Sequence, residues 1–198
     1  MNAINNLKMR VKLIGGFVVV ALIAALLAYL GYTNMKMIND GMTSMYFDRL
    51  VPVSDLGKVD AELYQFRGDV YKMLLIPSET SVSKTEMVTI VKDIDARIVK
   101  YKATSLLDTE VAELRVFETA WSEYQVSVNE IIAWHDAGND AATIASLTGT
   151  GRATTARKAV GESAQKLLDY NTTEAKNVNT QADITFSGAV LLLCWRWG

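Results

Sequence analysis

Residues 56–73 read LGKVDAELYQFRGDVYKM, and the spacing of their apolar side chains limits the folds open to the chain. Apolar residues recur in alternating steps of three and four, at Leu56, Val59, Leu63, Phe66, Val70 and Met73. This heptad spacing puts all of them on one stripe of an α-helix. A helix with a single apolar stripe is marginal in water, so it has to pack against other helices.

Three further segments have helical spacing. The apolar positions are Met87, Val91, Ile94, Ile98 and Tyr101 in the second segment, Leu114, Phe117, Trp121, Tyr124, Val128 and Ile131 in the third, and Val160, Leu167, Tyr170 and Val178 in the fourth. We expect the first helix to cover residues 31–76 and the fourth to cover residues 141–183. The predicted fold class is therefore all-α, an up-down-up-down four-helix bundle.

Turn signals separate the four segments. Pro77 and the Ser/Thr-rich residues that follow it end the first helix. Residues 104–109 form a short turn in which Asp108 is the expected helix cap. Residues 137–140 read AGND and supply a C-terminal glycine followed by an N-cap.

An apolar segment without charge precedes the bundle. Residues 13–35 contain no charged side chain, and about 20 apolar residues span a bilayer core. Lys8, Arg10 and Lys12 come directly before it and predict a cytoplasmic N-terminus. We expect residues 13–33 to be a transmembrane helix in the bacterial inner membrane. The alternative is a cleaved signal peptide, but the apolar core is longer than such peptides usually have.

A second apolar run begins at Ile184. It is interrupted by Arg196, and its twelve residues reach only about 18 Å. We expect residues 184–198 to be part of a second transmembrane helix, and the alternative is a segment that lies in the membrane interface. The predicted domains are thus a cytoplasmic N-terminus at 1–12, a membrane helix at 13–33, a periplasmic or extracellular bundle at 34–183, and the partial membrane helix.

Composition argues against several functions. The net charge of −2 gives no basic field that would attract nucleic acid. The only cysteine, Cys194, leaves no disulfide framework and no cysteine-based zinc site. No cluster of acid, base and nucleophile shares one helix face, so we expect neither an enzyme nor a metal or cofactor.

Two strings carry a family resemblance. Residues 6–17 read NLKMRVKLIGGF and residues 45–53 read MYFDRLVPV. The first resembles the N-termini of methyl-accepting chemotaxis proteins, and the second resembles the start of their four-helix-bundle sensory module. The resemblance implies a parallel homodimer in membrane lipid that binds a small ligand or a binding-protein partner. It also implies that a shift of the second membrane helix passes through a HAMP linker to a kinase-controlling coiled coil.

Neither a HAMP linker nor a signalling domain follows Gly198, so we expect a receptor fragment or a disrupted copy. The alternatives are a sensor module of a transmembrane histidine kinase or of a cyclic-nucleotide-signalling enzyme, and a structural membrane protein without a ligand. A further alternative is a truncated receptor fragment that does not signal. The cytoplasmic sequence that would distinguish these classes is not in the chain.

A ligand site is expected near the tip of the bundle. Arg67, Tyr64 and Tyr71 share one face of the first helix. In the aspartate-sensing branch of the resembled family, arginines at this level hold a ligand carboxylate across the dimer interface. Arg152 and Thr154, with Arg157 nearby, are expected to complete the site from the fourth helix. The ligand would be a small carboxylate or amino acid, because a guanidinium donates two parallel hydrogen bonds to a carboxylate. The competing interpretation is that these arginines are solvated or paired with acids.

Overall fold

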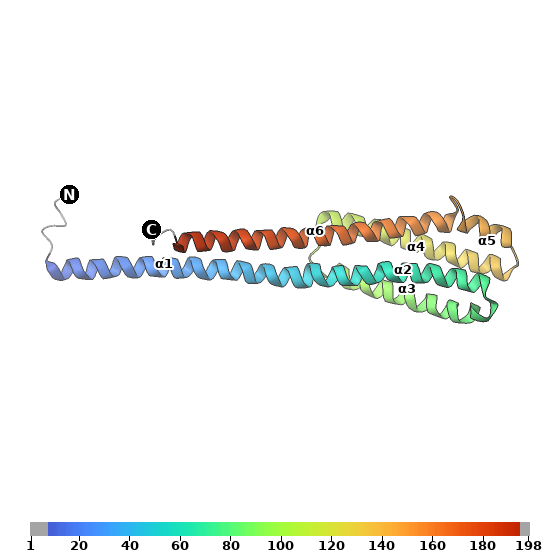
Figure 1. The fold of residues 1–198 in the computed structure, drawn as a ribbon, viewed down its shortest axis with the longest axis horizontal. Coiled ribbons are helices and arrows are strands. Elements are labelled where there is room, and N and C mark those ends of the chain that lie inside the picture. The colour runs from blue at the N-terminus through green and yellow to red at the C-terminus, as the bar shows by residue number, and fades with distance from the viewer. Residues whose placement is uncertain (1–7, 195–198) are drawn as a thin grey trace. The chain divides into compact units, whose positions relative to one another are not determined.

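The computed structural model describes residues 8–194, the side chains of 192–194 excepted, and within this range every secondary-structure element is a helix. In chain order the elements are α1 (Met9–Ser44), the π-helix η1 (Met45–Leu50), α2 (Val51–Leu75), the short 3-10 helix η2 (Pro77–Glu79), α3 (Thr80–Lys102), α4 (Asp108–Asp136), α5 (Asp140–Leu147) and α6 (Arg152–Cys194) (Figure 1). This confirms the all-α class. The first seven residues and residues 195–198, which include part of the second predicted membrane segment, lie outside the described range.

The chain forms two compact units. One comprises residues 1–43 and 177–198, and the other comprises residues 44–176. The second unit contains the four-helix bundle, built from α2, α3, α4 and the first part of α6, with α5 as a short connecting helix.

Cross-helix bonds fix the direction of each bundle helix. Early residues of one helix bond to late residues of its neighbour, as in Lys100–Asp55 (2.7 Å), Arg97–Glu62 (3.1 Å), Lys84–Asp136 (3.0 Å), Trp121–Asp95 (3.0 Å) and Ser163–Glu113 (3.1 Å). Each consecutive pair of helices is therefore antiparallel, and Figure 1 shows α2 beside α3 joined by the η2 turn. The up-down-up-down bundle is confirmed.

The core follows the predicted apolar stripes in the first three bundle helices. Every predicted position on α2 and α4 is buried, and on α3 only Val91 is partly exposed, with Ile90 buried beside it. The prediction for the fourth helix was less accurate, because Tyr170 and Val178 are only partly buried. The predicted Val160 and Leu167 are buried, and the small side chains of Ala153, Ala156 and Ala164 fill the rest of the seam.

The fourth predicted helix is divided in two. α5 ends at Leu147 and α6 begins at Arg152, so the prediction of one helix over residues 141–183 was wrong. Gly149 adopts a positive φ of 55°, which favours glycine. A Cβ on Gly151 would lie 2.1 Å from the carbonyl oxygen of Ala145, so the backbone passes too closely for any other residue.

Two helix starts were predicted with different success. Asp108 is the first residue of α4 and not its cap; the backbone N–H of Leu107 instead donates to the Glu110 carboxylate at 2.8 Å. The turn after α4 is as expected. Gly138 has a φ of 68°, and the Asn139 side chain accepts a hydrogen bond from the Ala142 N–H.

Pro52 explains the π-helical segment before α2. A proline lacks the N–H of a helical bond, and its ring presses on the carbonyl four residues earlier. The backbone widens here, and the Val51 N–H bonds to the Tyr46 carbonyl, five residues earlier. Arg49 lies inside this widened turn and its side chain is buried.

A buried ion pair joins this turn to the rest of the bundle. Arg49 Nη1 donates to Glu110 Oε2 at 2.8 Å, and Arg49 Nη2 donates to the Ser105 carbonyl at 2.9 Å. Glu110 has no exposed surface. Its second oxygen accepts from Tyr101 Oη at 2.5 Å and from Asn171 Nδ2 at 2.8 Å. The cluster thus unites η1, α3, α4 and α6 at one end of the bundle.

We predict that Arg49→Met lowers the free energy of unfolding by about 3–5 kcal/mol, because it leaves the Glu110 charge buried without a counter-ion. The double variant Arg49→Met/Glu110→Gln should recover part of this loss, since it removes the stranded charge. Circular dichroism during guanidinium unfolding of the full chain in detergent measures both. Arg115→Met, at an exposed position, is the control and should change stability by about 0.5 kcal/mol or less. A double variant less stable than the single one would contradict the role given to the ion pair.

Candidate ligand-binding groove

A groove lies between α2 and α6 within the second unit. It encloses about 340 Å³ and is lined by Asp60, Leu63, Tyr64 and Arg67 from α2 and by Arg157, Lys158, Gly161, Glu162 and Gln165 from α6. Gly161 is why there is room. Beyond its chain neighbours and the nearby backbone of α6, no atom lies within 4 Å of where its Cβ would stand, so the missing side chain leaves this stretch of the helix surface open.

Two arginines face this groove without an acidic partner. Arg67 and Arg157 are both half-buried, and neither forms an ion pair with any residue in the described part of the chain. The guanidinium carbon of Arg67 lies 5.5 Å from the centre of the Tyr71 ring, a cation–π distance. This contact orients Arg67 but leaves its N–H donors free for an anion. Asp60 and Glu162 lie in the same groove and add acceptors.

Tyr124 of α4 is a core residue near the two arginines of the groove. Its ring packs against Phe66 with centroids 5.4 Å apart and against Trp121 at 6.2 Å. Burial raises the pKa of the Tyr124 hydroxyl to about 12, while the charges of Arg157 and Arg67 act to lower it. Both arginines therefore lie close enough to the Tyr124 hydroxyl to act on its charge.

Arg152 lies elsewhere. Its Nε donates to Glu123 Oε1 at 2.5 Å and its Nη1 bonds to Glu130, so both carboxylates on α4 engage the guanidinium. These bonds raise the pKa of Arg152 and lower that of Glu123. Arg152 lines a separate cavity beside α4, with Thr150 and Thr155 among its neighbours. The half-buried Thr154 is not among the residues that line the α2–α6 groove.

The structure thus brings together part of the predicted set. Tyr64 and Arg67 line the groove, and Tyr71 contacts Arg67, whereas Arg152 and Thr154 do not join them. On the α6 side of the groove, the arginine is Arg157 and not the predicted Arg152. Sequence reasoning missed Gln165, although Arg157, Gly161 and Gln165 follow one another in steps of four and so share one face of α6.

No metal centre is apparent in the described residues. Among residues 8–194, no group of three or more His, Cys, Asp or Glu side chains is arranged to hold a metal ion.

The fold is an antiparallel four-helix bundle with an open groove, lined by charged side chains, between two of its helices. Comparison with protein-family models gives the specific family. Residues 6–186 match the four helix bundle sensory module for signal transduction, and the chain belongs to this family. Neither the curated proteins nor the solved structures contain a match to the chain.

We predict that alkaline pH destabilises the bundle partly through Tyr124. Its pKa is raised from 10.0 to about 12 in the folded chain, so its contribution is complete below pH 10 and is lost as pH rises towards 12. Tyr124→Phe should reduce the loss of unfolding free energy between pH 9 and pH 11 by about 1 kcal/mol. Denaturant titrations at the two pH values measure this. Tyr64→Phe, with its side chain 63% exposed, should leave the loss unchanged.

Proposed function

We propose that the chain is the ligand-sensing part of a transmembrane chemoreceptor, and that a small carboxylate or amino acid binds in the α2–α6 groove. The observation that supports this most directly is the pair of arginines, Arg67 and Arg157, that line one groove and lack acidic partners. Membership of a sensory signalling family supplies the context in which such a groove binds a signal molecule.

The groove suits a zwitterion better than a simple anion. The two guanidiniums match a carboxylate, because planar N–H donors form paired hydrogen bonds with it. Asp60 and Glu162 offer oxygens for an ammonium group on the same ligand. Tyr64 supplies an aromatic wall that is 63% exposed before binding. An amino acid meets all three requirements within a 340 Å³ cavity.

The proposal includes a membrane location. α1 contains a window of mean hydropathy 2.7 in which none of the side chains is buried within the protein, as a lipid-facing helix requires. Lys8, Arg10 and Lys12 before this window favour a cytoplasmic N-terminus and an extracytoplasmic bundle. α6 belongs to both units in one unbroken helix, so a ligand that moves α6 in the bundle also acts on the residues from 177 onward.

The receptor reading also includes a parallel homodimer and an output domain supplied by the rest of a receptor. In that arrangement, binding in the groove would shift α6 relative to α2. The shift would be transmitted through the second membrane segment to the cytoplasmic side.

We predict that an amino acid or a small organic acid raises the melting temperature of the full chain in detergent, because a ligand that binds only the folded state stabilises it. A thermal-shift screen of such compounds identifies the ligand. Arg67→Gln should then weaken binding about 10- to 100-fold, the value of one charge-assisted hydrogen bond.

The matched control is Arg115→Gln on α4, since Arg115 is exposed, lies outside the groove and also lacks an ion pair in the described residues. It should bind the compound as tightly as the unaltered chain does. If Arg67→Gln also binds with unchanged affinity, the site is wrong even though the sensory family stands.

For topology, we predict that Ser54→Cys, in a Cys194→Ser background, reacts with a membrane-impermeant maleimide added to spheroplasts. Ser54 is exposed in the bundle, so the reagent has access wherever the bundle faces outward. Labelling that appears only after the cells are lysed would place the bundle in the cytoplasm and reject the proposed orientation.

A further inference from the structure

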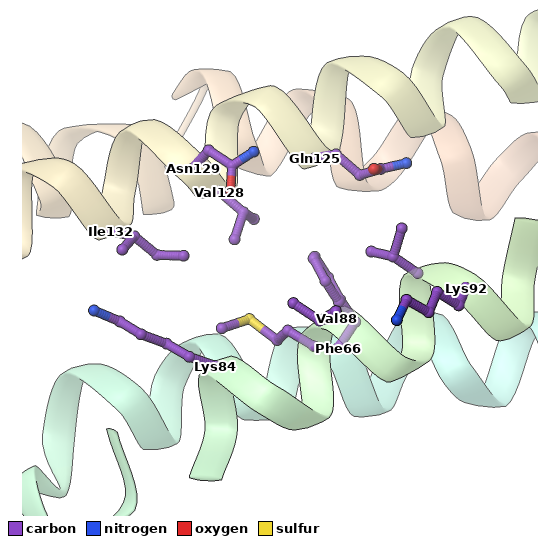
Figure 2. A pocket seen from close by; sticks show the side chains of 10 residues that line it. Phe66, Lys84, Val88, Lys92, Gln125, Val128, Asn129 and Ile132 are labelled. Atoms are coloured by element: carbon purple, nitrogen blue, oxygen red, sulfur yellow. The ribbon is translucent and has the colours of Figure 1, made fainter. Parts of the chain in front are cut away.

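A second pocket lies on another side of the bundle, between α3 and α4. It encloses about 270 Å³ (Figure 2). Lys84, Met87, Val88, Val91 and Lys92 line it from α3, Gln125, Val128, Asn129 and Ile132 line it from α4, and Phe66 of α2 closes it. In Figure 2 the side chains of Val128 and Ile132 point from α4 towards α3, and Val88 stands on the facing helix.

The floor of this pocket is apolar and belongs to the core. The exposed fraction is only 3% for Phe66, 4% for Met87 and 2% for Val128. Val88 at the edge is 55% exposed. A ligand that covers Val88 therefore removes apolar surface from water, which is worth roughly 25 cal/mol per Å².

The rim of the pocket carries two lysines and two uncharged amides, and no acidic residue is among the described residues that line the pocket. Lys84 and Lys92 flank it on α3, and the amides of Gln125 and Asn129 flank it on α4. Lys84 is held by Asp136 at 3.0 Å, so part of its charge is compensated. Lys92 is exposed and forms no ion pair with a described residue, so its ammonium group is available to a ligand.

We propose that the α3–α4 pocket is a second ligand site, which binds a hydrophobic monocarboxylate with its apolar body on Phe66, Met87 and Val88 and its carboxylate at Lys92. The size follows from the volume. A cavity of about 150 Å³ accommodates benzene, so 270 Å³ holds roughly ten non-hydrogen atoms. An arylacetate or a medium-chain fatty acid has this size and polarity.

The chemistry differs from that of the α2–α6 groove. That groove has two arginines and two acids around a small polar space, whereas the α3–α4 pocket has an apolar floor and no carboxylate in its lining. Phe66 lines one pocket and its neighbour Arg67 lines the other, so the two sites lie on different faces of α2. The second site therefore does not depend on the first.

The test uses the full chain in lipid nanodiscs with ¹³C-methyl methionine, and Met87→Leu assigns the Met87 resonance among the 8 methionines. Phenylacetate is the probe, and phenylacetamide is its uncharged counterpart of the same shape. Phenylacetate should shift the Met87 methyl resonance at about 10 mM, a concentration that detects even millimolar binding. It should bind about fivefold more tightly than phenylacetamide, as one solvent-screened charge pair allows.

Two pairs of variants locate the contacts. Lys92→Gln should reduce the affinity for phenylacetate to that for phenylacetamide, whereas Lys58→Gln on α2 should not change it. Val88→Phe should fill the pocket and abolish the Met87 shift, and Val99→Phe, at another exposed valine of α3, should retain it.

Three results would overturn the proposal. They are an unchanged Met87 resonance, equal affinity for the acid and the amide, and binding that survives Val88→Phe. Arg67→Gln, which tests the other groove, should leave the phenylacetate shift as it is. Failure of one site is therefore distinguishable from failure of the other.

Discussion

A charged pair in a low-dielectric interior needs further hydrogen bonds to offset the cost of its burial, and the Arg49–Glu110 pair draws these bonds from several helices of the bundle. Glu110 is wholly buried and accepts bonds from Arg49, Tyr101 and Asn171. These partners come from η1, α3 and α6, while Glu110 itself lies in the first turn of α4. If any of the four elements shifted by a turn, a buried charge or polar group would lose its partner. The pair therefore fixes the register of the helices at this end of the bundle, which apolar packing alone specifies less strictly.

Both proposed ligand pockets lie away from this end of the bundle. They meet at one aromatic cluster. Phe66 forms the floor of the α3–α4 pocket and packs edge-on against Tyr124 with centroids 5.4 Å apart, while the Tyr124 hydroxyl is influenced by Arg67 and Arg157 of the α2–α6 groove. A ligand in the α3–α4 pocket would thus lie against Phe66, and a ligand in the α2–α6 groove would lie beside arginines whose charges act on Tyr124. Whether the two sites are energetically coupled is measurable, because coupling requires that each ligand changes the affinity for the other by the same factor.

The sequence was most informative where large apolar side chains repeat. The stripes of α2 and α4 could be identified directly, because large apolar side chains such as Leu, Val, Phe and Trp at heptad spacing indicate the buried face of a helix. The α6 seam was harder to identify, since Ala153, Ala156 and Ala164 are apolar but small, and alanine is as common on helix surfaces as in cores. The break before α6 was missed because Gly149 and Gly151 matter through a positive φ and a close backbone approach. That error also misplaced Arg152, since its direction depends on where α6 begins.

Other features could not be predicted because they depend on partners far away in the sequence. Arg49 was visible only as part of a family-like string, because its partner Glu110 lies 61 positions away. Arg67, in contrast, was found from local spacing, because Tyr64 and Tyr71 stand one turn on either side of it. Phe66 and Arg67 then show how one helix contributes both to the core and to the groove. Neighbouring residues point about 100° apart on an α-helix, so the first reaches the core and the second reaches the groove. A ligand bound to Arg67, as we propose, would act on the same helical turn that carries Phe66, so the proposed binding site is directly connected to the core.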